Sequence, residues 1–93
     1  MCTVVNKYKE SYDVYIGRGS KWGNPYVIGA DGSREEVIEK YRAYLYSEIQ
    51  SGNVTRYDLI QLSGKKLGCF CKPQACHGDI IVKAFKWAME GEG

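Results

Sequence analysis

Three of the four cysteines of this chain, its only histidine and an aspartate lie within one stretch, residues 67–79. This cysteine-rich segment carries thiol, imidazole and carboxylate groups on Cys69, Cys71, Cys76, His77 and Asp79. Cys69 and Cys71 are two positions apart, so on a strand both side chains leave the same face. Such a gathering of soft and titratable groups is typical of a metal site, a reactive pocket or a tight corner of the core.

The metal interpretation rests on ligand type. Cys69, Cys71, Cys76 and His77 would suit tetrahedral zinc, with Asp79 as a hydrogen-bond acceptor for the imidazole. The spacing argues against it, because structural zinc sites usually draw their ligands in pairs from two separate turns of chain. Here all four candidate ligands lie within nine residues, and two of them are adjacent. We therefore expect no resident cofactor and keep zinc as the alternative.

Nucleophilic chemistry is the second interpretation of the same segment. If Cys76 or His77 lies in the first turn of the last helix, the free amides and the helix dipole favour a thiolate or a bound anion there. Neighbours in sequence seldom reach one another, so Cys71 with His77 is the better nucleophile–base pair. The structural alternative is that Cys69 and Cys71 are small buried strand residues, since free cysteine is among the most buried residue types.

A second candidate segment is the glycine-rich loop, residues 17–25. Its glycines allow backbone amides to approach an anion closely. We expect this loop to contact a ligand through Arg18, Gly19, Ser20, Lys21, Trp22 and Asn24. Arg18 and Lys21 could hold phosphate and Trp22 could stack on a base, although no Walker motif is present. In the structural alternative, Trp22 fills the core and the loop only sets a bend.

Composition limits the functions that are open to the chain. Its 93 residues fit one domain, residues 1–93, and a net charge of +2 is too small for a non-specific nucleic-acid binder. No apolar run approaches the roughly 20 residues of a membrane-spanning helix, and the first residues lack the pattern of a signal peptide. We expect a cytoplasmic protein with reduced cysteines, no membrane partner and no nucleic-acid partner. A homodimer stays open.

The two candidate segments are set among short strands and amphipathic helices. Strands are predicted at residues 3–5, 12–16 and 66–71, with a further extended piece at 26–28. Ser33 and Glu36 form a capping box that begins a helix, and Gly52 is placed to end it. Asn53 or Thr55 can cap a second helix over residues 57–62, and a third runs from about residue 76 or 77 to residue 89.

This order predicts an α/β fold: a small two-layer domain with a short mixed sheet covered by three helices. Both candidate segments directly follow predicted strands. Open α/β sheets bind ligands beyond the carboxyl ends of their strands. The sequence therefore predicts that the glycine-rich loop and the cysteine-rich segment form one mouth.

The two motifs, VYIGRGSKWGNP at residues 14–25 and GCFCKPxxCHGD at residues 68–79, resemble those of a small family found in bacteria and bacteriophages. That family carries the label "domain of unknown function". The resemblance spans nearly the whole chain and implies a stand-alone α/β domain with both motifs in one site. It implies no particular reaction. Its phage association suggests a counter-defence setting, such as sequestering a nucleotide-derived host signal.

Our leading hypothesis is a protein that binds, and in a phage setting sequesters, a phosphorylated nucleotide-like small molecule between the loop at 17–25 and the turn at 71–79. The expected ligand contacts are Arg18, Gly19, Ser20, Lys21, Trp22, Asn24, Cys71, Lys72, Cys76, His77 and Asp79. The first alternative is a nucleotide-processing enzyme that cleaves a glycosidic or phosphoester bond. Its catalytic candidates are Cys71, Cys76, His77 and Asp79. The second alternative is a zinc-stabilised interaction module.

Overall fold

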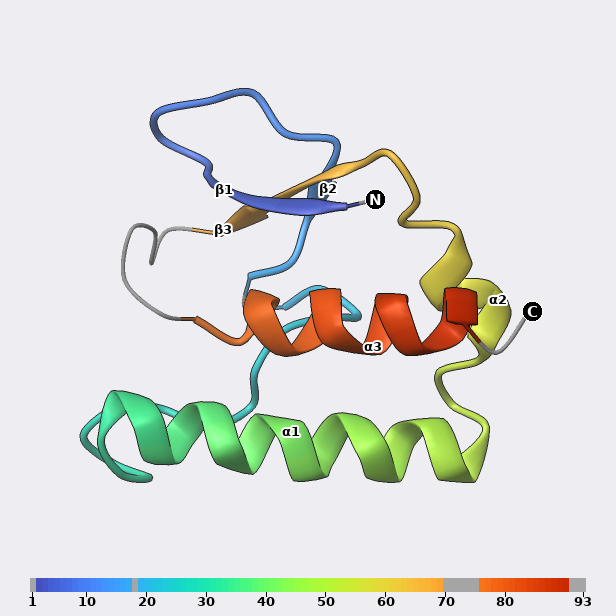
Figure 1. Cartoon of the computed structure of the whole chain (residues 1–93). Helices are drawn as coiled ribbons and strands as arrows, with labels where there is room; N and C mark the ends of the chain where they lie inside the picture. The colour runs from blue at the N-terminus through green and yellow to red at the C-terminus, as the bar shows by residue number, and fades with distance from the viewer. Residues whose placement is uncertain (1, 18, 70–75, 91–93) are drawn as a thin grey trace.

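A computed structural model describes residues 2–17, 19–69 and 76–90 and confirms a small α/β fold (Figure 1). Its elements in chain order are β1 (Thr3–Asn6), β2 (Val14–Tyr15), α1 (Arg34–Ser51), α2 (Arg56–Ile60), β3 (Lys66–Cys69) and α3 (Gly78–Glu90). The predicted extended piece at residues 26–28 is a turn and bend instead. Among the described residues, no helix is long and apolar enough to cross a membrane.

The sheet has the strand order β1-β3-β2, and both pairings of its described strands are parallel rather than mixed. The connection between β1 and β2 explains the difference. The Lys7 amide donates to the Cys69 carbonyl at one end of β3, whereas the Asp13 amide donates to the Lys66 carbonyl at the other end. The loop between them thus returns the chain to the amino-terminal edge of β3 before β2 begins. The sequence indicates a loop between the first two strands, but it does not indicate the edge of the sheet to which this loop returns the chain.

The loop between β1 and β2 also covers the face of the sheet that lies away from the helices (Figure 1). A Cβ atom added to Gly68 of β3 would lie 2.5 Å from Cγ of Tyr12. Glycine at this position therefore lets the Tyr12 ring pack directly on the central strand. Tyr12 was expected within a strand at 12–16, but regular pairing is limited to Val14–Tyr15.

The capping box that the sequence predicted for α1 is present. The Glu36 amide donates to Ser33 Oγ, and the Ser33 amide donates to a carboxylate oxygen of Glu36. Gly52 ends the helix with a left-handed φ of 88°. A second capping box, Thr55 with Asp58, begins α2. Both helices thus begin where short polar side chains accept the first free amides.

α3 lies between the sheet and α1 (Figure 1). Its sequence repeats apolar residues at helical spacing, and one face is buried. The buried residues of α3 are Gly78, Ile80, Ile81, Phe85 and Ala88. A Cβ atom on Gly78 would lie 2.9 Å from side-chain atoms of Ile16 and Val4, so glycine permits the helix to begin against the sheet. The start of α3 is therefore held at the end of β2.

Candidate functional site

The candidate site is the carboxyl edge of the parallel sheet. Because both pairings are parallel, β1, β2 and β3 all end at this edge, at Asn6, Tyr15 and Cys69. The glycine-rich loop follows β2, and the cysteine-rich segment runs from β3 to the start of α3. The described parts of both segments therefore meet at one end of the fold.

His77 joins the two segments directly. Its Nε2 lies 2.7 Å from the carbonyl oxygen of Ile16. A carbonyl only accepts, so Nε2 carries the proton and donates. The side chain is 9 % exposed and its ring packs edge-on against Tyr41, with 4.9 Å between centroids. Burial lowers the pKa of His77 below its ordinary value of 6.5, while the carbonyls of Ile16 and Trp22 act in the opposite direction. The imidazole is thus a buried, mainly neutral link.

Tyr41 of α1 holds the glycine-rich loop at a second point. Its hydroxyl donates to the Trp22 carbonyl over 2.8 Å. Burial raises the pKa of Tyr41, so the hydroxyl stays protonated and remains a donor. His77 and Tyr41 together hold the loop at Ile16, the residue before it, and at Trp22 within it, on either side of Gly17 and Gly19.

Cys76 lies two residues before α3, and its side chain helps to hold the start of that helix. The Gly78 amide donates to Cys76 Sγ over 3.2 Å, and the Cys76 amide donates to a carboxylate oxygen of Asp79 over 3.3 Å. The sulfur thus accepts from the first amide of α3, one of the amides that have no partner within the helix. Cys76 Sγ also lies 3.2 Å from Cys69 Sγ at the end of β3. Both thiols are buried.

The glycine-rich loop divides into buried and exposed parts. Trp22 is 6 % exposed and packs in the core, so its ring offers no exposed stacking face in this structure. Ser20 Oγ donates to the Gly17 carbonyl over 2.6 Å, and Asn24 Oδ1 accepts from the Tyr26 amide over 2.9 Å. These two side chains hold the loop in shape. Gly19 is exposed, with a left-handed φ of 89°.

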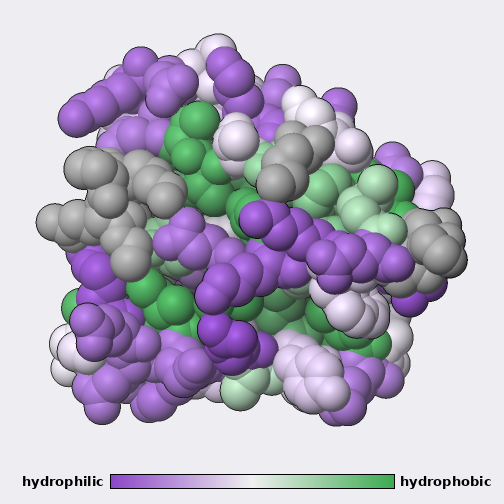
Figure 2. Space-filling model, in the orientation of Figure 1, coloured by the Kyte–Doolittle hydropathy of each residue, from purple (hydrophilic) through white to green (hydrophobic). Residues whose placement is uncertain are grey.

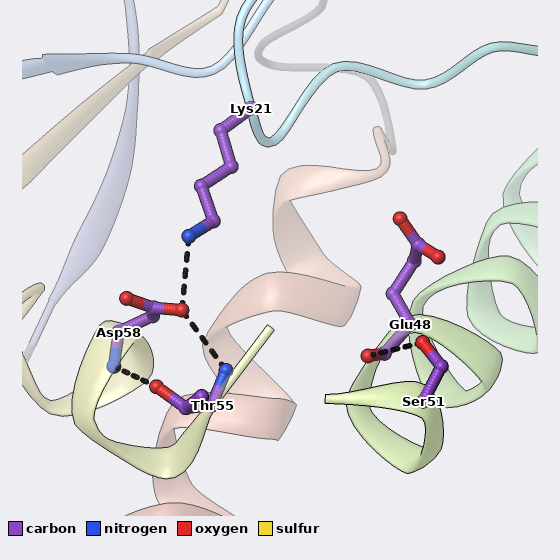
Figure 3. A network of polar contacts seen from close by, with 5 residues as sticks. All are labelled: Lys21, Glu48, Ser51, Thr55 and Asp58. Carbon is purple, nitrogen blue, oxygen red and sulfur yellow. Dashed lines mark hydrogen bonds and ion pairs between the residues drawn. The ribbon is translucent and has the colours of Figure 1, made fainter. Parts of the chain in front are cut away.

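Lys21 is the cation of this loop among the residues that the structure describes, and it forms an ion pair with a residue of α2. Its Nζ lies 2.9 Å from Asp58, the residue that also completes the α2 capping box with Thr55 (Figure 3). The side chain of Lys21 remains half-exposed. In this structure the ammonium group is therefore directed to α2.

Three predicted contacts, Arg18, Cys71 and Lys72, lie outside the described residues. For the zinc alternative, residues 2–17, 19–69 and 76–90 contain no group of three histidine, cysteine, aspartate or glutamate side chains placed to hold a metal. The described candidates give one thiol pair, Cys69 and Cys76, and a histidine whose Nε2 is turned to a carbonyl.

Sequence reasoning missed Lys7 and Tyr8, which directly follow β1 at the same edge. Tyr8 is 77 % exposed, and Lys7 Nζ lies 5.0 Å from the Tyr8 ring centroid and 4.8 Å from that of Tyr15. The signal was available: any residue after a strand of a parallel sheet belongs to the ligand edge. To use this signal, one must already know that β1 is parallel to β3.

The sequence motifs also gave no sign of a cavity of about 350 Å³ between α1 and α3. Its lining residues are Arg42, Leu45, Tyr46, Ile49, Ile80, Lys83, Ala84 and Trp87. Figure 2 shows hydrophobic surface, drawn in green, along the furrow between these helices. The signal for this cavity was the pair of exposed aromatic residues on the helices, Tyr46 and Trp87.

A family model described as "Domain of unknown function (DUF4326)" matches residues 4–87, a range that includes both motifs. The chain belongs to this family. It is 52 % identical over 83 residues to an uncharacterized 12.4 kDa protein from the nrdA-td intergenic region of Enterobacteria phage T4, covering 88 % of this chain and 75 % of that protein.

A second relative comes from another virus. The chain is 32 % identical over 99 aligned residues to an uncharacterized protein of Acanthamoeba polyphaga mimivirus, covering 87 % of this chain and 72 % of the relative. No solved structure matches the chain. The predicted relationship to a small domain family of unknown function that occurs in phages is therefore confirmed.

Proposed function

We propose that the carboxyl edge of the sheet binds a phosphorylated, nucleotide-like small molecule between the glycine-rich loop and the turn at residues 71–79. The observation that carries the proposal is the hydrogen bond of 2.7 Å from His77 Nε2 to the Ile16 carbonyl. It joins the two segments at the edge where open α/β sheets bind ligands. A site that is fixed in this way before the ligand arrives loses less entropy on binding.

The groups that recognise phosphate are cations and exposed backbone. Arg18, assigned from the sequence, offers a planar fork, and Lys21 offers an ammonium group. Breaking the ion pair between Lys21 and Asp58 requires little free energy, because an exposed ion pair contributes only about 0–1 kcal/mol. The left-handed backbone at Gly19 leaves the loop open to close approach of an anion.

The stacking role falls to tyrosine rather than to the buried Trp22. Tyr8 is highly exposed, and Lys7 lies between its ring and that of Tyr15. Aromatic rings stack on any base, and such contacts contribute about 1–3 kcal/mol per base. The edge therefore combines cations with an aromatic face, as a nucleotide requires.

Binding is favoured over turnover by what the acid–base candidates already do. The proton on His77 Nε2 is given to a carbonyl, and Asp79 accepts from the Cys76 amide. These groups shape the site, so we propose a protein that sequesters its ligand intact. Its relatives in phage T4 and mimivirus fit a viral setting, in which removal of a host nucleotide signal is the proposed role.

Calorimetric titration with NAD, ADP-ribose, cyclic nucleotides and nucleoside phosphates tests the proposal. Against the probe that binds, Arg18→Ala should weaken affinity by roughly 1.5–3 kcal/mol, the value of a charge-assisted contact, and leave the melting temperature unchanged. Arg42→Ala is the matched control, because it removes the same charge from the cavity between α1 and α3. Unchanged affinity in Arg18→Ala, or an equal loss in Arg42→Ala, would contradict the assignment.

A further inference from the structure

Two buried thiols meet beneath the candidate site. Cys69 Sγ and Cys76 Sγ are 3.2 Å apart, closer than two sulfur atoms in simple van der Waals contact. Cys69 ends β3, and Cys76 lies two residues before α3, where its sulfur accepts from the first amide of that helix. A disulfide needs about 2.05 Å between the sulfurs, so the pair is about 1 Å from bonding distance.

The surroundings of the two sulfurs are not equal. The Gly78 amide donates to Cys76 Sγ at the amino terminus of α3. An amide donor and the positive end of the helix dipole both stabilise a thiolate over a thiol. Cys76 is therefore the nucleophile of the pair, and Cys69 is the thiol that resolves it.

We propose that Cys69 and Cys76 form a reversible intramolecular disulfide, with a peroxide as the oxidant. The Cys76 thiolate attacks one peroxide oxygen, which gives a sulfenic acid and, with a proton from solvent, water. The Cys69 thiolate then attacks the Cys76 sulfur and displaces hydroxide, which takes up the proton released by Cys69 to give a second water. Two thiols thus become one disulfide, and hydrogen peroxide becomes two water molecules. A dithiol reverses the change by thiol–disulfide exchange.

The disulfide would act on the ligand site through the start of α3. His77, the residue after Cys76, holds the Ile16 carbonyl over 2.7 Å. Drawing the sulfurs together also alters the contact from the Gly78 amide to Cys76 Sγ at the start of α3. This consequence, unlike the disulfide itself, rests on the proposed function. We expect the oxidised protein to bind its nucleotide probe at least about fivefold more weakly.

The test treats the reduced full-length chain with hydrogen peroxide, alkylates the remaining thiols and measures the intact mass. The expected product has lost two hydrogen atoms and carries alkyl groups on two of its four cysteines, and its fragment spectrum joins Cys69 to Cys76. Dithiothreitol added before alkylation should restore a chain with four alkylated cysteines. A folded wild type that keeps all its thiols, or fragments that join Cys71 to either partner, would overturn the proposal. This readout needs neither a variant nor a ligand.

Single variants give an independent measurement. Cys69→Ser and Cys76→Ser should each abolish the mass change, whereas Cys71→Ser should keep it. Cys2→Ser is the matched control: Cys2 is another buried thiol, but it lies before β1 at the opposite edge of the sheet. Loss of the product in Cys2→Ser or Cys71→Ser would also overturn the assignment. Equal probe affinity of the oxidised and reduced wild type would refute control of the ligand site even if the disulfide forms.

Discussion

At the scale of single residues, His77 has the largest structural role in the candidate site. The sequence shows it as the only histidine, beside a cysteine, and predicts that it contacts the ligand, with proton transfer as the alternative. The structure places its Nε2 on the Ile16 carbonyl, 61 positions away in the chain. A contact over that separation depends on strand order and helix placement. Local pattern could not predict it.

The buried imidazole predicts a pH dependence of stability. Burial lowers the pKa of His77 in the folded state, so the unfolded chain binds the proton more readily. The contribution to stability is complete above the ordinary pKa of 6.5 and is lost as pH falls below it toward the folded pKa. Chemical denaturation at about pH 7.5 and about pH 5.5 should show a lower free energy of unfolding at the acidic value.

The control for this experiment is His77→Gln, which cannot titrate. Its free energy of unfolding should change less over the same interval. Carboxylates whose pKa is lowered, such as those of Glu36 and Asp58, act at lower pH and are common to both proteins. Equal pH slopes for wild type and variant would show that His77 does not titrate as a buried neutral group.

The contact between Gly68 and Tyr12 is a second residue-scale prediction. Gly68→Ala places a Cβ 2.5 Å from Tyr12 Cγ, so the ring must move off the central strand. Overpacking of this kind costs about 1–3 kcal/mol in the free energy of unfolding. In a Tyr12→Ala background the same substitution should cost clearly less, because the clashing ring is gone. Additive costs in this double-mutant cycle would mean that the ring is not what excludes a side chain.

At the scale of elements, the sequence predicted what local chemistry determines. The sequence predicted a capping box of Ser33 with Glu36, and it left Asn53 or Thr55 as the cap of the second helix. In the structure Ser33 and Thr55 are the N-caps. Strand limits were predicted less well, since β2 is reduced to two residues where a strand over 12–16 was expected. The end of a strand depends on its partner, whereas a helix cap depends on residues three positions away.

The α1 capping box can be tested by substitution. Ser33→Ala removes the acceptor for the Glu36 amide and should lower the free energy of unfolding by about 1 kcal/mol. Ser51→Ala is the control at the other end of α1, where the exposed hydroxyl only donates to the Glu48 carbonyl (Figure 3). It should change the free energy by less than about 0.5 kcal/mol. Equal effects in urea denaturation would contradict a specific role of the cap.

At the scale of the whole molecule, the sequence predicted the layers but not the direction of the strands. A mixed sheet and a parallel sheet have the same local pattern, and the strand pairings, together with the hydrogen bonds of the loop over residues 7–13, decide between them. The parallel arrangement matters for the site because it adds the end of β1, with Lys7 and Tyr8, to the other two strand ends. Those two residues could not be assigned to the site from a motif.

The absence of a resident metal remains a prediction for the whole domain. If zinc held Cys69, Cys71, Cys76 and His77, metal binding would supply a large part of the folding free energy of so small a domain. We expect the melting transition of the purified chain to be unchanged in excess EDTA. A collapsed transition that added zinc restores would replace this account of the thiol pair with a metal site.

The central claim is that the carboxyl edge of the sheet holds an intact nucleotide-like ligand. The most direct measurement is native mass spectrometry after incubation with NAD, ADP-ribose, cyclic nucleotides and nucleoside phosphates, followed by chromatography of the released molecule. The account predicts one ligand per chain for at least one of these probes, recovered unchanged, and its loss in Arg18→Ala but not in Arg42→Ala. Failure to retain any of them, or consumption of one over many turnovers, would contradict it.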